Sequence, residues 1–355
     1  MKKMLLPALL SLVLAAGCTT TAPTAKNTYY FFPPPPDESH LQYLTGFQSE
    51  LGFRGTEDKT FLNYLTGTKP LRRELSKPYG VAVHGNNYYI CDTEFGAIIV
   101  LDVHTRKMRL FRAEGEGALK LPLNLTLDAD GTAYVADSQR DQVVIFDKDE
   151  NYVATIGKSG DMKPRDVAVG KDKIYIADLQ KHCVRVFDKA SRSELESLPK
   201  GDDAKNAKAE ILTPTNLALD REGNLYVGDT GGFHVLVFDA TGRYVRTIGE
   251  FGDGPSQFAR VKGVAVDHDK RLYAVDAMSQ VTQIFDASGR LLSWVADPTA
   301  TKATQSLPAK VMVDYDNVNA FKEYISPEFR AEYLVVIINQ TGPHKVSVYA
   351  FGQKQ

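Results

Sequence analysis

Short apolar stretches that follow a proline recur along the chain and set its organisation. The copies read PYGVAV from Pro78, PLNLTL from Pro122, PRDVAV from Pro164, PTNLAL from Pro214 and PAKVMV from Pro308, with VKGVAV from Val261 lacking the proline. They are brief and rich in Val and Leu, which favours β-strands over helices. Each copy is therefore predicted to be one strand, and the whole chain to be all-β.

Three further strand patterns follow each copy. The second ends in an aspartate in five units, at Asp92, Asp137, Asp178, Asp229 and Asp276, and reads IINQ up to Gln340 in the sixth. The third ends in another aspartate, at Asp102, Asp147, Asp188, Asp239 and Asp286, and reads SVYA in the sixth. A fourth apolar stretch, such as NYVATIG from Asn151, precedes the next unit. With turn residues between them, these patterns predict four short strands per unit.

Four-stranded units that recur every roughly 40 to 65 residues are typical of propeller blades. The sixth unit lacks a fourth strand, because the chain ends soon after Ala350, and HLQYLTGF at His40–Phe47 is the natural donor. A strand from the N-terminal side would close the ring and remove an exposed sheet edge. The predicted fold is therefore a six-bladed β-propeller of antiparallel blades, spanning 40–355. Its predicted blades cover about 76–112, 121–157, 162–200, 212–249, 260–296 and 307–350.

The repeats resemble the NHL family of propellers. The likeness is most specific in EFGDGPSQFARVKGVAVD, Glu250–Asp267, and around His182 after Asp178, and it covers about residues 75 to 350. The His and Arg that usually follow the strand-ending aspartate are mostly replaced, as in DSQRDQ at Asp137–Gln142. The resemblance implies a propeller, but it gives no partner-binding residues for this chain.

The N-terminal segment has the features of an export signal. Lys2 and Lys3 precede an apolar stretch from Met4 to Ala16, which is short for a membrane span. Its end, LAAGC at Leu14–Cys18, resembles a bacterial lipobox, which implies a signal peptide at 1–17 and a lipid on Cys18. Multiple acyl chains would anchor the protein stably. The alternative is an ordinary cleaved signal.

The segment 18–39 is predicted to be a tether, made semi-rigid by the prolines at 33–36. Its alternative role is a docking motif for an aromatic groove. Thr19 after the cysteine, in place of the aspartate typical of inner-membrane retention, indicates the outer membrane, with the protein facing the periplasm or the cell surface.

Charge and cysteine content narrow the function further. The chain has 355 residues, with 42 basic and 44 acidic side chains interspersed and a formal net charge of -2, so no electrostatic footprint for nucleic acid is present. Cys91 and Cys183 fall in different predicted blades, so no disulfide is expected. Cys91 takes a position held elsewhere by Ala136, Ala177 and Gly228, which indicates a small packed side chain.

Two insertions and the repeated aspartates are further candidate sites. The five strand-ending aspartates suit a turn in which the carboxylate bonds nearby backbone N–H groups. The insertions are 51–75, where FLNYLTG suggests a helical turn, and Tyr315–Glu332, which interrupts blade six. The second predicts a short amphipathic helix broken by Pro327, either packed on the disc or available for binding.

The residues two positions after each proline lie where the innermost strands begin. They are Gly80, Asn124, Asp166, Asn216, Gly263 and Lys310. Because Gly, Asn and Asp tolerate left-handed backbone, one interpretation is a shared turn. The other is that Asn124, Asp166 and Asn216 converge as oxygen ligands for Ca²⁺. Similarity to gluconolactonase and paraoxonase propellers would then imply a metal-dependent lactonase or esterase at the channel mouth.

A zinc lyase of the peptide-amidation type was the other enzymatic alternative. It needs converging histidines, whereas those of this chain scatter over different strand levels. The histidines of the predicted blades are His84, His104, His182, His234, His268 and His344.

The sequence therefore favours a non-catalytic, envelope-anchored binding scaffold that forms a monomeric ring and needs no cofactor. Several side chains of both signs are expected around one axial pocket suited to a peptide segment or a small polar ligand. The predicted binding residues are Tyr79, Asn124, Arg165, Asp166, Asn216, Lys262 and Lys310. The competing expectation for these residues is that they only line a water-filled channel.

Overall fold

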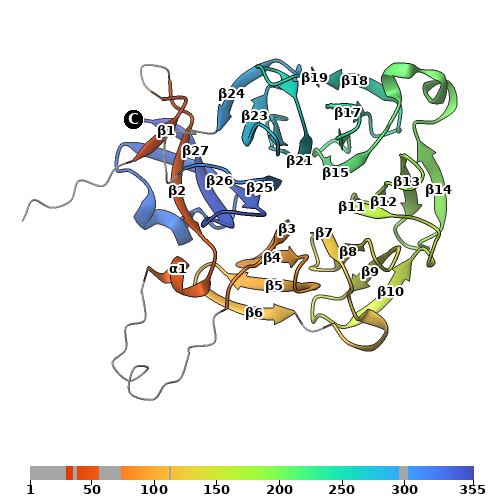
Figure 1. Ribbon diagram of the computed structural model, residues 1–355, viewed down its shortest axis with the longest axis horizontal. Helices are drawn as coiled ribbons and strands as arrows, with labels where there is room; N and C mark the ends of the chain where they lie inside the picture. Colours follow the sequence, from red (N-terminus) through yellow and green to blue (C-terminus); the bar gives the residue numbers. More distant parts are fainter. Residues whose placement is uncertain (1–28, 35–37, 56–72, 112, 296–302) are drawn as a thin grey trace, which may run out of the picture.

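Six antiparallel sheets, five of four strands and one of five, surround a central axis in the computed structural model (Figure 1). The structure describes residues 29–34, 38–55, 73–111, 113–295 and 303–355. The predicted signal peptide, Cys18, most of the tether and the FLNYLTG segment lie outside the described residues. The predicted six-bladed β-propeller is confirmed.

The blades follow one another in chain order, each beginning with its innermost strand. Blade one contains β3 (Pro78–His84), β4 (Asn87–Asp92), β5 (Ala97–Asp102) and β6 (Lys107–Phe111). Blade two contains β7 (Pro122–Leu127), β8 (Ala133–Asp137), β9 (Gln142–Phe146) and β10 (Tyr152–Ile156). Blade three contains β11 (Pro164–Val169), β12 (Lys173–Asp178), β13 (Cys183–Asp188) and β14 (Glu194–Leu198). Blade four contains β15 (Pro214–Leu219), β16 (Leu225–Asp229), β17 (His234–Phe238) and β18 (Tyr244–Ile248). Blade five contains β21 (Val261–Val266), β22 (Leu272–Asp276), β23 (Val281–Phe285) and β24 (Leu291–Val295).

Blade six closes the ring as the sequence predicted. Its own strands are β25 (Pro308–Asp314), β26 (Phe329–Asn339) and β27 (Val346–Lys354), and β2 (Leu41–Phe47) pairs antiparallel with β27. A further strand from the N-terminal side, β1 (Tyr30–Phe32), adds to β2, so this sheet has five strands. The sequence had not predicted this outermost strand.

Short elements lie in the connections. They are α1 (Glu50–Arg54), η1 (Gly115–Gly117), η2 (Gly201–Lys205), η3 (Ala207–Ala209), η4 (Val318–Tyr324), and the parallel pair β19 (Glu250–Phe251) and β20 (Gln257–Phe258). Within the described part of the chain, the helices are all too short to cross a bilayer.

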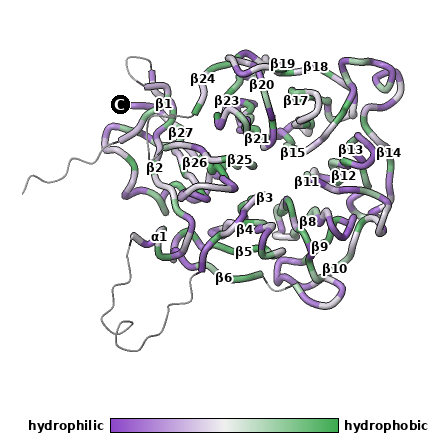
Figure 2. The backbone as a smooth tube through the Cα atoms, in the orientation of Figure 1, coloured by the Kyte–Doolittle hydropathy of each residue, from purple (hydrophilic) through white to green (hydrophobic). Residues whose placement is uncertain are grey.

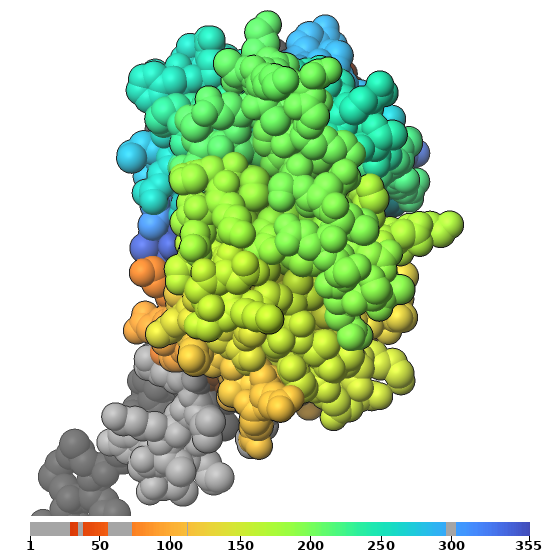
Figure 3. All heavy atoms as spheres, turned by 90° about the vertical axis from the view of Figure 1, so that its right-hand side faces the viewer, coloured from red at the N-terminus to blue at the C-terminus, as the bar shows by residue number. Residues whose placement is uncertain are grey.

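The hydrophobic core is divided among the six seams between blades. In β8, Val135 packs toward blade one and Tyr134 toward blade three, because successive strand residues point to opposite faces of a sheet. Both faces of every blade are thus buried, and hydrophobic stretches recur along the strands of each blade in Figure 2. Seen from the rim, successive blades stack as one continuous surface (Figure 3).

The insertion in blade six is packed against the disc. It forms the 3₁₀ helix η4, which ends at Tyr324, before Pro327, and the last residues of the predicted insertion, 329–332, belong to β26. Phe321 is fully buried and stacks on Phe53 of α1 with ring centroids 5.5 Å apart. Gln42 of β2 donates to the carbonyl of Tyr324 and accepts from the backbone N–H of Ser326. The insertion therefore fixes the closing strand to the ring.

Candidate functional site

All six innermost strands begin on the same side of the disc, here called the proline face. Each strand pairing carries a β-bulge directly after its first residue, for example between Pro164 and Asp166. None of the described residues two positions after the proline has a positive φ. The predicted left-handed turn is therefore wrong, and the small residues have another cause: a Cβ on Gly80 or Gly263 would lie 2.6 Å from the backbone of the next blade.

The strand-ending aspartates are structural, as predicted. The carboxylate of Asp137 accepts from the backbone N–H groups of Gln139 and Arg140, at 3.1 and 3.0 Å. It also accepts from Lys120 and Leu121, at 2.6 and 3.0 Å, which are the residues that lead into β7. The other four aspartates make equivalent contacts with the segment before their own innermost strand.

In blade six an asparagine fills this structural position. Asn339 pairs with Pro308, as Asp229 pairs with Pro214, and its Oδ1 accepts from the backbone N–H of Ser306 at 3.0 Å. The equivalent residue is thus Asn339. The sequence pattern had pointed to Gln340 instead. An amide oxygen accepts hydrogen bonds from backbone N–H groups as a carboxylate oxygen does, so an asparagine can hold the same turn.

The predicted binding residues form two layers at the proline-face end of the axis. The lower layer holds residues two positions after the proline, namely Asn124, Asp166, Asn216 and Lys310. The upper layer holds residues one position after the strand start, namely Tyr79, Arg165 and Lys262.

An ion pair across the axis dominates the lower layer. Lys310 Nζ lies 2.6 Å from Asp166 Oδ2, and both residues are buried. They belong to blades six and three, which lie opposite each other in the ring (Figure 1). Asp166 also accepts from the backbone N–H groups of Leu217 and Val167, at 2.9 and 2.8 Å. Burial raises the pKa of this carboxyl group, and the Lys310 ammonium opposes that rise.

The two asparagines of the lower layer use their amide groups on backbone carbonyls. Asn124 Nδ2 donates to the carbonyl of Arg165 at 2.9 Å, and Asn216 Nδ2 to that of Thr215 at 2.7 Å. Their Oδ1 atoms are buried and make no hydrogen bond with the described residues. The sequence placed these side chains at one level, but it gave no sign of Lys310 reaching across the axis.

This arrangement does not fit the calcium site considered from the sequence. The cation already present beside Asp166 is the ammonium of Lys310, and the carboxylate also accepts from two backbone N–H groups. A hard cation needs several oxygen ligands, of which carboxylates supply the charge. Across the described residues, His, Cys, Asp and Glu side chains form no group of three that could hold a metal.

The axial cavity beyond the ion pair lies among the innermost strands. It measures about 300 Å³ and, apart from Lys310, is lined by Val, Leu, Ala, Thr and Met side chains of all six innermost strands. The sequence had predicted one polar axial pocket. Of the predicted residues, Lys310 lines this cavity, and the other residues that line it come from the strand positions after the bulge, which are mostly of apolar type.

The upper layer is positively charged. Lys262 is only 7% exposed and its Nζ lies 4.8 Å from the centroid of the Tyr79 ring. Burial, helped by the nearby charges of Arg260, Arg165 and Lys77, lowers the pKa of Lys262 to about 8. No acidic side chain within the described structure forms an ion pair with it.

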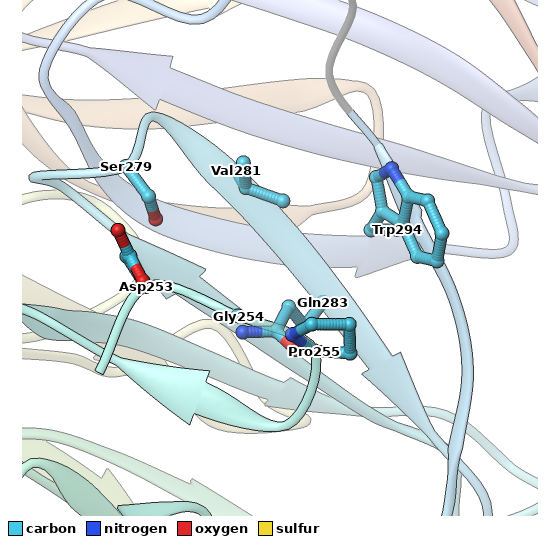
Figure 4. Close-up of a pocket in the computed structure, with 7 residues that line it drawn as sticks. All are labelled: Asp253, Gly254, Pro255, Ser279, Val281, Gln283 and Trp294. Carbon is cyan, nitrogen blue, oxygen red and sulfur yellow. The ribbon is translucent and has the colours of Figure 1, made fainter. Parts of the chain in front are cut away.

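A shallow pocket of about 200 Å³ lies away from the axis, between the β19–β20 segment and blade five. Figure 4 shows the Trp294 indole at one end and Asp253 with Ser279 at the other. Gln283 of β23 holds the β19–β20 segment against blade five. Its side chain accepts from the backbone N–H of Ser256 at 2.8 Å and donates to the carbonyl of Gln257 at 2.7 Å. This pocket was not predicted from the sequence.

Both cysteines in the described part of the chain, the buried Cys91 and the half-buried Cys183, are free, as expected. Cys91 is fully buried, and burial raises the pKa of its thiol well above the ordinary value. Cys183 is partly buried, and the pKa of its thiol is raised to about 11, again chiefly by burial. Thiols with raised pKa values are poor nucleophiles at neutral pH.

Comparisons with known proteins agree with the architecture. A family described as "6-bladed beta-propeller" matches residues 209–342. No curated protein matches the sequence significantly. A gluconolactonase from Xanthomonas campestris has 17% identity and a TM-score of 0.56, with 78% of this chain and 86% of that chain covered.

Two further solved structures are similar at the same level. A protein of unknown function from Bacteroides thetaiotaomicron has 17% identity and a TM-score of 0.56, covering 78% of this chain and 70% of its own. A streptogramin B lyase has 12% identity and a TM-score of 0.53, covering 79% and 84%. At such identities the likeness extends to the fold alone. The chain is a six-bladed β-propeller.

Proposed function

We propose that this protein is a non-catalytic binding scaffold of the bacterial envelope, which recognises a peptide segment or a small polar ligand at the axial end of the proline face. The observation that carries the proposal is the layered arrangement at the axis. A charge-compensated pair, Lys310 and Asp166, spans the ring, and the charged upper layer lies next to it without such compensation.

The lower layer supports binding over catalysis. Asp166 is the buried carboxylate that a metal-dependent lactonase would need at this level, and it is held by one ammonium and two backbone donors. Activating a water would require breaking these contacts. Calcium added to the purified protein should therefore produce neither bound metal nor esterase turnover that Asp166→Ala abolishes.

Membrane attachment is the second part of the proposal. The lipobox-like LAAGC motif supports a lipid on Cys18, with Thr19 directing the protein to the outer membrane. A Cys18→Ser variant should leave the membrane fraction, and mass spectrometry should find Cys18 acylated at the mature N-terminus. A membrane-bound Cys18→Ser variant would contradict the anchor without affecting the axial site.

The binding proposal is tested by affinity capture of the tagged protein from its own host. Partners should be lost with Arg165→Ala and with Lys262→Ala, and retained with Lys158→Ala. Lys158 is an exposed lysine in the connection between blades two and three, so its variant removes the same charge away from the axis. If a partner is still captured by both axial variants but not by Trp294→Ala, the binding site is the outer pocket beside Trp294.

A further inference from the structure

The upper layer brings together three side chains from blades one, three and five. Tyr79, Arg165 and Lys262 each follow the first residue of an innermost strand. Blade six contributes Ala309 at the equivalent position, between Tyr79 and Lys262 around the ring. Because alanine is small, the lysine extends past it to the tyrosine ring, at 4.8 Å.

Among the described residues, no carboxylate forms an ion pair with Arg165 or Lys262. The groups that act on Lys262 are Arg165, Arg260 and Lys77, all cationic, with the Tyr79 ring beneath the ammonium. Asp166, the acidic group of the neighbouring layer, is paired with Lys310. The carboxylates of Asp92 and Asp276 are used by backbone N–H groups of the segments containing Lys77 and Arg260.

An unsatisfied donor lies within the same layer. The Tyr79 hydroxyl is buried, with the residue only 5% exposed, and makes no well-formed hydrogen bond, although Arg165 lies close to it. Burial raises the pKa of this hydroxyl, so it remains a protonated donor. A buried polar group without a partner costs free energy, part of which a bound acceptor would recover.

We infer that Tyr79, Arg165 and Lys262 form an oxyanion site, which binds a carboxylate or phosphate group of the ligand. The inference rests on the proposed axial function and deepens it by naming the ligand chemistry. A guanidinium presents two parallel donors to such a group, an ammonium supplies the opposite charge, and the phenol donates a third hydrogen bond. The anion compensates the charge that the fold leaves unpaired.

The binding is expected to depend on pH. An anion stabilises the charged form of Lys262 and therefore raises its pKa on binding. Affinity should be highest below about pH 8, where the amine is protonated, and should fall as the pH rises through that value. Arg165, Arg260 and Lys77 keep the remaining positive charge, so some affinity persists above it.

The experiment is titration calorimetry of the purified full chain with succinate and with inorganic phosphate, at constant ionic strength set with chloride. Binding of either anion is expected, and the anion that binds more tightly identifies the group. Lys262→Met and Arg165→Met should each weaken it by about tenfold or more, which equals about 1.4 kcal/mol. Tyr79→Phe should weaken it by a smaller factor, and Lys158→Met should leave it unchanged.

Two outcomes of the calorimetry would overturn the inference. One is that neither anion binds the wild-type chain; the other is equal weakening by Lys158→Met and Lys262→Met, which would indicate nonspecific screening. A partner captured through the axial face, yet not displaced by either anion, would also contradict the oxyanion site while leaving the proposed function intact. Thermal unfolding of each variant without ligand verifies that it folds.

Discussion

Lys310 and Lys262 are two buried lysines on neighbouring innermost strands, and each is 7% exposed. Lys310 crosses the axis to a carboxylate 2.6 Å away. Lys262 meets an aromatic ring and three other cations, with its pKa lowered to about 8. The Lys310 ammonium is therefore paired within the fold, whereas the Lys262 ammonium forms no ion pair with the described residues.

The comparison shows that burial alone does not distinguish a structural charge from a binding one. Desolvation acts on both lysines, and the difference lies in what faces each ammonium. A buried charge with a partner stabilises the specific arrangement of the ring. A buried charge without one costs stability, which is typical of a site that is used for recognition.

The largest expected effect follows from breaking the lower layer. Lys310→Met would leave the Asp166 carboxylate buried without its ammonium, and should lower the free energy of unfolding by about 3–5 kcal/mol. Chemical denaturation measures this loss. The double variant Lys310→Met with Asp166→Asn should recover most of it, because the unpaired charge is gone. A single variant as stable as the wild type would remove the distinction between the layers.

A smaller loss is expected from crowding the lower layer. A Cβ on Gly263 would lie 2.6 Å from Lys310 Cα, and backbone atoms cannot move aside easily. Gly263→Ala should therefore destabilise the ring by about 1–3 kcal/mol in thermal or chemical unfolding. Gly170→Ala is the matched control, because its Cβ would meet ordinary contacts of 3.7 Å and longer. Equal stability of the two variants would contradict the tight packing at the bulge.

Removing the charge of Lys262 from the upper layer should raise stability, whereas the two changes in the lower layer should lower it. Lys262 has a folded pKa of about 8, below the ordinary value of 10.5, so the unfolded chain binds more protons between these values. Stability should consequently rise with pH through this window, by up to about 1.4 kcal/mol per pH unit from this group. Lys262→Met should remove that rise and stabilise the protein at pH 7 by about 1–2 kcal/mol.

Urea unfolding of the wild type and of Lys262→Met at several pH values between neutral and 10 measures the difference. Subtracting the two curves isolates Lys262 from the tyrosines that titrate above this range. If Lys262→Met is less stable than the wild type at pH 7, the ammonium has a partner within the fold and the comparison fails.

The fold was predictable because its signals are local and repeated. Each proline, strand-ending aspartate and turn recurs six times or nearly so, and the missing fourth strand of blade six pointed to His40–Phe47. The additional strand β1 was missed because three residues, Tyr30–Phe32, give no periodicity. Asn339 was misplaced by one residue because the aspartate signal is absent there.

The site was predictable only as a set of residues at one level. Sequence spacing placed Asn124, Asp166 and Lys310 near the axis, but the pairing of Lys310 with Asp166 joins residues 144 positions apart. Which charges are compensated depends on such contacts across the ring. The outer pocket beside Trp294 was not predictable either, because its walls come from a linker and a neighbouring blade.

The smallest expected effect on stability concerns Tyr79. Its hydroxyl makes no well-formed hydrogen bond, and phenylalanine keeps the ring under the Lys262 ammonium. Tyr79→Phe should therefore change the free energy of unfolding by no more than about 0.5 kcal/mol, because removing an unpaired buried hydroxyl is close to neutral. The same variant should bind succinate or phosphate less tightly than the wild type. A stability loss of more than about 1.5 kcal/mol would mean that the hydroxyl is already satisfied within the fold. Unchanged stability together with weaker anion binding is the combination expected of a donor held for a ligand.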